Sequence, residues 1–359
     1  MRLAVCLAGL VFAIFARCTV ADESCRVAFD MGSSGIRAGA TDSILTTRIE
    51  IDFLSPLWAG RGLEEVTAPT IAALNELPAK AGFPAECIRV GGGFSAWRLA
   101  SEQDAGSLAG ILGRIRSATG VSVQVMPQLR EGAYGYFAAR KLLGDKLVTS
   151  HILDVGGGSL QVAGERTTFG EALGQKIWQR QLCQEIRNAE TTPCGLQAMT
   201  REELTAAREL LQQKLSGIAQ ALPDPVTMTA ISRPVSRGVL PAVRRLSGSG
   251  VDNQFTRAEL TAAIDRIADL SIQETASLVG SPAAYVAYLL SDMLLVEGLM
   301  LVTGGDLLRV AELDLTNLPG LLADDKAYEW ARNYDCYLSR LRTMGAAAYN
   351  SEPASCPNQ

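Results

Sequence analysis

The sequence predicts an α/β fold of two similar domains that face each other across a cleft, because one local pattern occurs twice. Residues 152–165 read as an apolar strand ending at Asp154, then three glycines, a serine and a second strand. The same order of strand, acid, glycine and hydroxyl turn, and strand begins at residue 26, with Asp30 as the acid. A duplicated domain would produce such a pair, so we expect each half to contribute one loop to a shared cleft.

Each loop has the composition of a site for a phosphate and a metal ion. Consecutive glycines let the backbone turn tightly and bring its N–H groups close to an anion. A carboxylate beside the turn cannot bind a phosphate directly, but it can hold a hydrated divalent cation that the phosphate shares. One such loop alone would fit a solvent-facing hairpin equally well. The second copy favours a cradle for a metal and a phosphate.

The chain of 359 residues is long enough for two domains that follow an export signal. Residues 1–21 contain a basic residue, an apolar run and small residues before Asp22, which is the pattern of a cleaved secretory signal. The apolar run is too short to span a bilayer. We therefore expect a periplasmic or secreted protein.

The cysteines and the net charge narrow the class of protein further. Six of the eight cysteines follow residue 21, and an even number in an exported chain indicates disulfides. The expected pairs are Cys183–Cys194, Cys336–Cys356 and Cys25–Cys87. None of these pairs has the spacing of a zinc site. The net charge of −5 provides no basic field for a nucleic acid.

Strands and helices alternate along the rest of the chain. Strands are expected at residues 88–90, 121–126, 226–231 and 307–315. Helices are expected at residues 67–77, 106–119, 127–143, 174–186, 200–222, 256–270, 283–302 and 323–344, and Pro78 should end the first of them. The helix at 283–302 carries Asp292 and Glu297, so we expect it in a protein core rather than in a membrane. We place the first domain at residues 22–148, the second at 149–322, and a C-terminal helix with a disulfide-tied tail at 323–359.

Two charged residues outside the loops have both a structural and a catalytic interpretation. Glu131 lies near the start of the helix at 127–143, where it could simply favour the helix dipole or act as a general base facing the cleft. Arg98 could clamp a phosphate with its planar fork or be a solvated residue at a helix start. The only histidine is His151, on a strand of the expected core, so a triad of serine, histidine and aspartate is excluded.

The two loops, DMGSSGIR from Asp30 and DVGGGSLQ from Asp154, resemble the phosphate loops of the actin-like ATPase superfamily. Within it, FSAWRLA from Phe94, QLREG from Gln128 and the helix from Phe255 are similar to segments of the exopolyphosphatase/guanosine pentaphosphate phosphatase family. The stretch EGAYGY from Glu131 and the glutamine that ends GGGSLQ are closer to the apyrases, the nucleoside triphosphate diphosphohydrolases. Both resemblances imply two RNase H-like domains with an inter-domain cleft.

The resemblance also implies a role for each residue of the loops. Asp30 and Asp154 would hold hydrated Mg²⁺ or Ca²⁺. Glu131 would activate a water molecule that Ser159 and Gln161 position. The residues that would bind the phosphates are Gly32, Ser33, Ser34, Arg37, Arg98, Gly156, Gly157 and Gly158. This chemistry is positioning and electrostatics, so it needs no covalent nucleophile.

The chain departs from the polyphosphatase pattern mainly in its second half. SRPVSR at residues 232–237 replaces a Gly-Gly-Thr turn, and AELDLTNLPG from Ala311 replaces a segment with an arginine and an acid. Gln161 stands where that family would place an acid, which favours apyrase-like chemistry. These changes affect the half of the cleft where the rest of the substrate would bind.

The expected function is that of an exported, metal-dependent phosphohydrolase. It would cleave phosphoanhydride bonds of nucleoside polyphosphates or inorganic polyphosphate with an activated water. The alternative is a catalytically weak or inactive protein that binds or senses polyphosphate or nucleotides. The expected partners are a small or polymeric phosphate substrate, with no nucleic acid and no stable membrane anchor, and a homodimer is left open.

Overall fold

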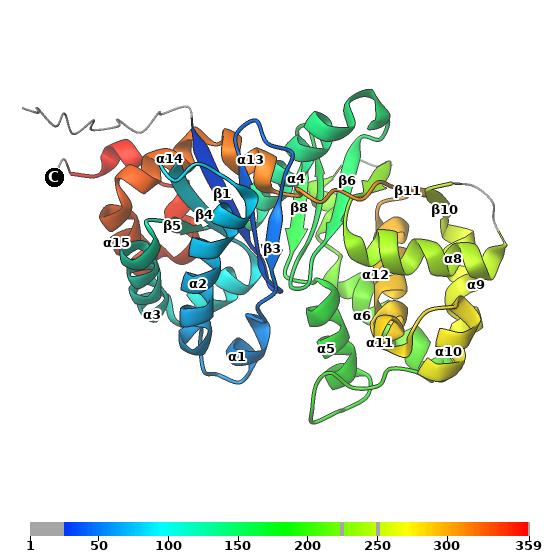
Figure 1. Ribbon diagram of the computed structural model, residues 1–359. Coiled ribbons are helices and arrows are strands. Elements are labelled where there is room, and N and C mark those ends of the chain that lie inside the picture. The colour runs from blue at the N-terminus through cyan, green and yellow to red at the C-terminus, as the bar shows by residue number, and fades with distance from the viewer. Residues whose placement is uncertain (1–24, 223–225, 249–251, 358–359) are drawn as a thin grey trace, which may run out of the picture.

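The computed structural model describes residues 25–222, 226–248 and 252–357, and it confirms an α/β architecture built on two sheets. The predicted export signal at residues 1–21 lies outside the described residues. Each sheet belongs to one of two lobes that lie side by side (Figure 1). The predicted two-domain α/β class is therefore confirmed.

The first sheet has five strands in the order β3-β2-β1-β4-β5. They are β1 (Arg26–Met31), β2 (Ile36–Ala40), β3 (Thr47–Ile49), β4 (Ile88–Gly93) and β5 (Ser122–Val125). β1 lies in the centre, antiparallel to β2 and parallel to β4, and it is buried from Val27 onward. A strand buried on both faces needs apolar side chains. Asp30 is the exception, and it lies next to the end of the strand.

The second sheet has six strands in the order β10-β11-β9-β6-β7-β8. They are β6 (His151–Val155), β7 (Leu160–Gly164), β8 (Thr168–Glu171), β9 (Met228–Ala230), β10 (Gln254–Thr256) and β11 (Leu307–Val310). β6, β7 and β8 are successive antiparallel neighbours, and β9 runs parallel to β6. This arrangement repeats that of β1, β2, β3 and β4, as a duplicated domain predicts.

The helices of the first lobe come from both ends of the chain. They are α1 (Leu54–Trp58), α2 (Glu64–Ala81), α3 (Ser95–Thr119), α13 (Leu318–Ala323), α14 (Asp325–Arg332) and α15 (Tyr334–Met344), followed by short 3-10 turns at Gly345–Asn350 and Pro353–Ser355. Figure 1 shows the last helices, in orange and red, beside the blue strands of the first sheet. The rings of Tyr328, Trp330, Tyr337 and Tyr349 are fully buried in the first core. The C-terminal segment therefore completes the lobe that the N-terminal segment begins.

Helix α15 also covers the edge of the first sheet. The hydroxyl of Tyr337 accepts a 2.7 Å hydrogen bond from the amide of Val125 in β5. The hydroxyl of Tyr334 accepts from the amide of Val123 at 3.1 Å and donates to its carbonyl at 2.8 Å. Unpaired backbone groups of an edge strand are thus satisfied by side chains.

Helix α4 (Gln128–Leu143) and the short turn Gly144–Lys146 lead from the first lobe to the second. The remaining helices cover the second sheet: α5 (Gln175–Glu185), α6 (Arg201–Lys214), α7 (Ile218–Ala221), α8 (Leu240–Ser247), α9 (Arg257–Ile267), α10 (Ile272–Val279), α11 (Ala283–Val286) and α12 (Leu289–Val302). α12 is buried along nearly its whole length, as expected for a core helix. None of the described helices is long and apolar enough to cross a membrane.

Several predicted helix limits were wrong. The helix predicted at 106–119 begins at Ser95, and the one predicted at 200–222 is broken between α6 and α7. α2 continues through Pro78 and ends at Ala81, because Gly82 adopts the left-handed conformation that caps it. The helix predicted at 283–302 is broken between α11 and α12, and the one predicted at 323–344 is broken at Asn333. All three predicted disulfides are present: Cys25–Cys87, Cys183–Cys194 and Cys336–Cys356.

Candidate active site

The two glycine loops have the same construction. In the first, Asp30 pairs with Arg37 across the hairpin of β1 and β2. In the second, Asp154 pairs with Gln161 across the hairpin of β6 and β7. Each acid therefore lies at the same place relative to its turn, and each lobe contributes one acid and one turn.

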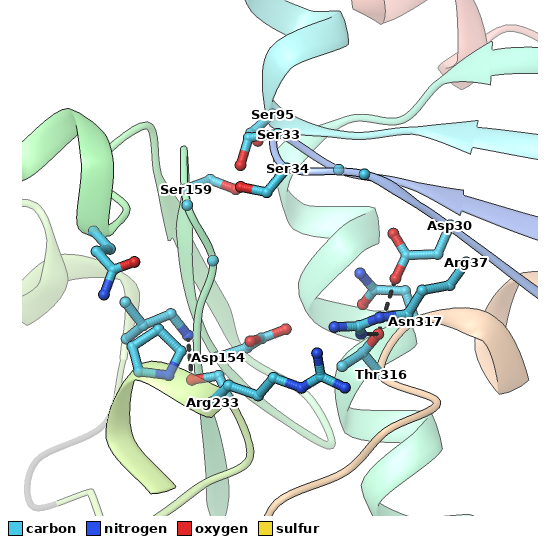
Figure 2. A pocket seen from close by; sticks show the side chains of 18 of the residues that line it. Asp30, Ser33, Ser34, Arg37, Ser95, Asp154, Ser159, Arg233, Thr316 and Asn317 are labelled. Carbon is cyan, nitrogen blue, oxygen red and sulfur yellow. Dashed lines mark hydrogen bonds between the residues drawn. The ribbon is translucent and has the colours of Figure 1, made fainter. Parts of the chain in front are cut away.

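The two turns approach each other closely, which explains why glycines occupy the second one. A side chain at Gly157 would collide with the hydroxyl of Ser33, and one at Gly158 would collide with Ser95. The amides of these two glycines donate no hydrogen bond to any described residue. Figure 2 shows four hydroxyls gathered at this meeting point, those of Ser33, Ser34, Ser95 and Ser159. Free amides and hydroxyls at one point suit a phosphate.

The two aspartates are buried, with 8% of each residue exposed. Thr316 donates a 2.8 Å hydrogen bond from Oγ1 to Asp30 Oδ2, whereas no described residue donates to the Asp154 carboxylate. Burial raises the pKa of Asp30 although Arg37 lies nearby. Burial, and then repulsion from Glu131 and Asp30, raises the pKa of Asp154 to about 7. Burial thus disfavours the charged form of both carboxyl groups, an effect that a bound cation would offset.

Glu131 forms the centre of a third group of residues, in the first turn of α4. Its Oε2 lies 2.7 Å from Nη2 of Arg98, and each side chain is 9% exposed. Ser159 Oγ accepts hydrogen bonds from Arg98 Nη2 and Gln161 Nε2, both at 3.1 Å, and lies 3.4 Å from Glu131 Oε2. Glu131 Oε1 accepts no hydrogen bond from the described residues. Burial raises the pKa of Glu131, while Arg98 acts in the opposite direction.

Arg98 has a different place from the other predicted phosphate ligands. Its guanidinium is buried and donates to Glu131, to Ser159 and, at 3.0 Å, to the carbonyl of Met126. It does not line the cavity between the lobes. The interpretation of a solvated arginine at a helix start was therefore wrong.

A cavity of about 600 Å³ lies between the two loops and takes its walls from both lobes. The predicted site residues that line it are Asp30, Gly32, Ser33, Ser34, Arg37, Glu131, Asp154, Gly156, Gly157 and Ser159. The other three predicted site residues, Gly158, Arg98 and Gln161, do not line the cavity. Figure 2 shows Asp30, Arg37, Thr316 and Asn317 on one side of the cavity, with Asp154 facing them.

Several residues of the cavity wall were not predicted. They are Arg48, Ser95, Gln175, Ser232, Arg233, Arg237, Asp292, Thr316 and Asn317. SRPVSR at 232–237 did attract attention as a departure from a family pattern. Thr316 gave no local signal, because it meets Asp30 from a position 286 residues away.

The residues of the cavity fit a divalent cation held by two carboxylates. Asp154 lacks a hydrogen-bond donor among the described residues, and Arg37 offsets only part of the burial and repulsion that raise its pKa. Among the described residues no group of three or more histidine, cysteine or acidic side chains could hold a metal ion. Asp30 and Asp154 could supply two ligands, and water and phosphate oxygens the rest, as in the usual shell of Mg²⁺.

Comparisons of the sequence and of the structure with known proteins agree on one protein family. The Ppx/GppA phosphatase family matches residues 86–313. A Ppx/GppA family member of Aquifex aeolicus is 18% identical, with 83% of this chain and 96% of that chain covered and a TM-score of 0.63. An exopolyphosphatase of Cytophaga hutchinsonii is 13% identical, with 83% and 97% covered and a TM-score of 0.60. At these identities the structures show a shared fold. No curated protein sequence matches the chain.

Proposed function

Because the chain belongs to the Ppx/GppA phosphatase family and is a phosphoanhydride hydrolase, we propose that it is exported and metal-dependent and that it hydrolyses nucleoside polyphosphates or inorganic polyphosphate with an activated water. Three disulfides support export, since such bonds persist in oxidising compartments. The arrangement around Glu131 supports the chemistry. This chemistry needs no covalent intermediate with a residue of the cavity.

The observation that carries the mechanism is that the two carboxylate oxygens of Glu131 have different hydrogen-bond environments. Oε2 is held by Arg98 and Ser159, so the carboxylate cannot rotate freely. Oε1 has no donor among the described residues, and the residue lines the cavity. Oε1 can therefore accept a proton from a water molecule as that water attacks a phosphoryl group.

Ser159 and Gln161 would position that water through Glu131 rather than react with the substrate. The hydroxyl of Ser159 accepts hydrogen bonds from Arg98 and Gln161, and its own proton is donated to Glu131 Oε2 at 3.4 Å. Arg98 opposes the rise in the pKa of Glu131 that burial causes, because a paired buried charge is less costly than an isolated one. Gln161 lies opposite Asp154 across the hairpin of β6 and β7. Because it is an amide and not an acid, it adds no negative charge beside Asp154.

The two loops would hold the transferred phosphoryl group. Ser33, Ser34 and the free amide of Gly157 supply donors from opposite lobes. A divalent ion bound by Asp30 and Asp154 would neutralise phosphate oxygens and so stabilise charge on the transferred group. A site formed from two lobes also excludes bulk water when they close on the substrate.

The test is the variant Glu131→Gln, which preserves shape and the contact with Arg98 but removes the base. We expect phosphate release to fall by roughly two to four orders of magnitude, while binding of tripolyphosphate, measured by calorimetry, is retained. Glu102→Gln changes an exposed glutamate on α3 and serves as the matched control. Near-normal turnover in Glu131→Gln would contradict the assignment of Glu131 as the general base.

A second experiment measures phosphate release by the wild type from four candidate substrates, each with Mg²⁺: ATP, ADP, a tetraphosphate nucleotide and long-chain polyphosphate. Release of phosphate from any of them supports a hydrolase and names its substrate. Release from none of them, together with binding to one, would favour a binding or sensing protein.

A further inference from the structure

A cluster of two buried tyrosines and one aspartate lies one helical turn from Glu131 and outside the cavity. It consists of Tyr134 in α4, Asp324 between α13 and α14, and Tyr349 in the turn Gly345–Asn350. The hydroxyl of Tyr134 donates a 2.6 Å hydrogen bond to Asp324 Oδ2, and the hydroxyl of Tyr349 donates to the same oxygen at 2.7 Å. Tyr134 and Tyr349 are 4% and 0% exposed. We call these three residues the tyrosine cluster.

The hydrogen bonds of the tyrosine cluster fix its members more closely than apolar packing would. Asp324 Oδ2 accepts both tyrosine protons, while Oδ1 accepts a 3.1 Å hydrogen bond from the amide of Lys326. The side chain of Asp324 is only 12% exposed, so water competes little for these bonds. A buried polar network whose groups are satisfied rigidifies the elements that it joins. The tyrosine cluster therefore ties α4 to the C-terminal segment in one arrangement.

The tyrosine cluster also reaches the residues that hold the partner of Glu131. The ring of Tyr134 meets the ring of Phe94 edge to face at 6.5 Å, and its hydroxyl lies 3.8 Å from the sulfur of Met126. Arg98 is bonded to both of these residues, through its amide to the Phe94 carbonyl at 2.9 Å and through its guanidinium to the Met126 carbonyl at 3.0 Å. Tyr134 thus supports Glu131 through their shared helix and through the setting of Arg98.

The C-terminal segment that provides the rest of the cluster is itself held firmly. Helix α13 lies directly on α4, because a side chain at Gly320 would collide with the backbone of Tyr134. The disulfide Cys336–Cys356 joins α15 to the chain just beyond Tyr349. The segment can therefore act as a fixed support for α4.

We propose that Asp324 and Tyr349 are positioning residues, which act through Tyr134 to hold Glu131 in the geometry needed to accept a proton from water. The proposal rests on the proposed function, since it takes Glu131 as the general base. The family model matches residues 86–313, so both positioning residues lie beyond the matched region. The C-terminal segment would then do more than complete the first core: it would set the rate of the chemical step.

The test uses Tyr349→Phe and Tyr134→Phe, which each remove one hydroxyl and keep the ring. We expect kcat for phosphate release to fall about tenfold in both while KM changes by less than about threefold, because a small misplacement of a catalytic group slows the reaction more than it weakens binding. Amide hydrogen exchange at residues 132–136 of α4 should become about tenfold faster, because the helix opens locally more often.

Tyr334→Phe is the matched control. Its hydroxyl is also buried in the first lobe, but it bonds to Val123 at the edge of the sheet rather than to Asp324. We expect this variant to lose stability and to keep both kcat and the exchange of α4. A tenfold fall of kcat in the control as well would mean that any loss of packing in the first lobe has this effect, and it would contradict the proposal.

A double variant separates the positioning of Glu131 from other effects of Tyr349. Glu131→Gln has no base left to position, so adding Tyr349→Phe should lower the residual phosphate release by less than about twofold. A further tenfold loss would overturn the proposal, because Tyr349 would then act independently of Glu131.

Unchanged kcat in Tyr349→Phe and Tyr134→Phe, or a raised KM with kcat kept, would also overturn the proposal. If Tyr349→Phe does not fold, Asp324→Asn, which retains one acceptor oxygen, provides the same readouts. If the wild type releases phosphate from no substrate, the proposed function fails, and hydrogen exchange alone decides whether the tyrosine cluster holds α4. Faster exchange in both tyrosine variants then supports the cluster as a support for α4, and unchanged exchange refutes it.

Discussion

The buried carboxyl group of Asp292 should make the stability of the protein depend on pH. This residue lies in the first turn of α12, lines the cavity and is 4% exposed. Gln175 Nε2 donates a 2.5 Å hydrogen bond to Oδ2, while Oδ1 has no partner among the described residues. Burial raises the pKa of Asp292 to about 8, and the hydrogen bond from Gln175 offsets only part of this effect.

The perturbation is Asp292→Asn, which keeps the shape and the acceptor for Gln175 but cannot ionise. Between the ordinary aspartate pKa of about 4 and the folded value, the folded wild type binds one proton more than the unfolded chain. Its free energy of unfolding therefore falls by about 1.4 kcal/mol for each pH unit as the pH rises through this window, and the contribution is fully present only below the unfolded pKa. The stability of Asp292→Asn relative to wild type should thus grow by roughly 3 kcal/mol from about pH 5.5 to about pH 7.5.

The assay is urea unfolding of both proteins, followed by circular dichroism at several pH values with the disulfides intact. The difference between the proteins isolates this one group, because every other titration is common to both. Asp306→Asn, the same substitution at an exposed side chain, controls for the change of residue type. A stability difference that stays constant across the range would refute the reasoning, since it would mean that Asp292 is already ionised in the folded protein.

Three other substitutions test the packing around the site. Arg98→Met leaves Glu131 buried without its partner, so we expect a loss of about 3–5 kcal/mol in the free energy of unfolding and a pH–activity profile moved to higher pH, because the pKa of Glu131 then rises further; an unmoved profile would contradict this. Gly174→Ala would drive a methyl group into the carbonyl of Gly156, so we expect a loss of about 1–3 kcal/mol and weaker tripolyphosphate binding; calorimetry that finds wild-type affinity would count against it. Gly110→Ala has open space in the middle of α3 and should raise the free energy of unfolding by about 0.5–1 kcal/mol in urea titrations; any destabilisation there would show that the helix is strained.

The parts of the site that could be predicted are those that the local sequence determines. A strand, an acid and a glycine turn are neighbours in the chain, so Asp30 and Asp154 could be found without a structure. Arg37 and Gln161 were named from the resemblance of the loops to family motifs, and the structure pairs them with these aspartates across each hairpin. The start of α4 placed Glu131 in the same way, because Pro127 marks where that helix begins.

The contacts that could not be predicted join distant segments. Arg98 reaches Glu131 and Ser159 across separations of 33 and 61 residues, so its burial behind the cavity depends on how α3, α4 and β7 pack. Thr316 reaches Asp30 only because the chain crosses back between the lobes. The helix breaks at Asn333 and ahead of α12 were missed for a related reason: apolar periodicity continues through them, and tertiary packing decides where each helix bends.

The return of α13, α14 and α15 to the first lobe determines the order in which the molecule can be completed during synthesis. The second lobe has emerged from the ribosome before the residues that fill the first core, among them Trp330 and Tyr349, exist. Until α15 arrives, the backbone of β5 is an open edge on the sheet that carries Asp30. A chain cut after residue 320 would retain every residue of the cavity wall and still lack the cover of that edge. Premature termination would therefore damage the N-terminal half of the site first.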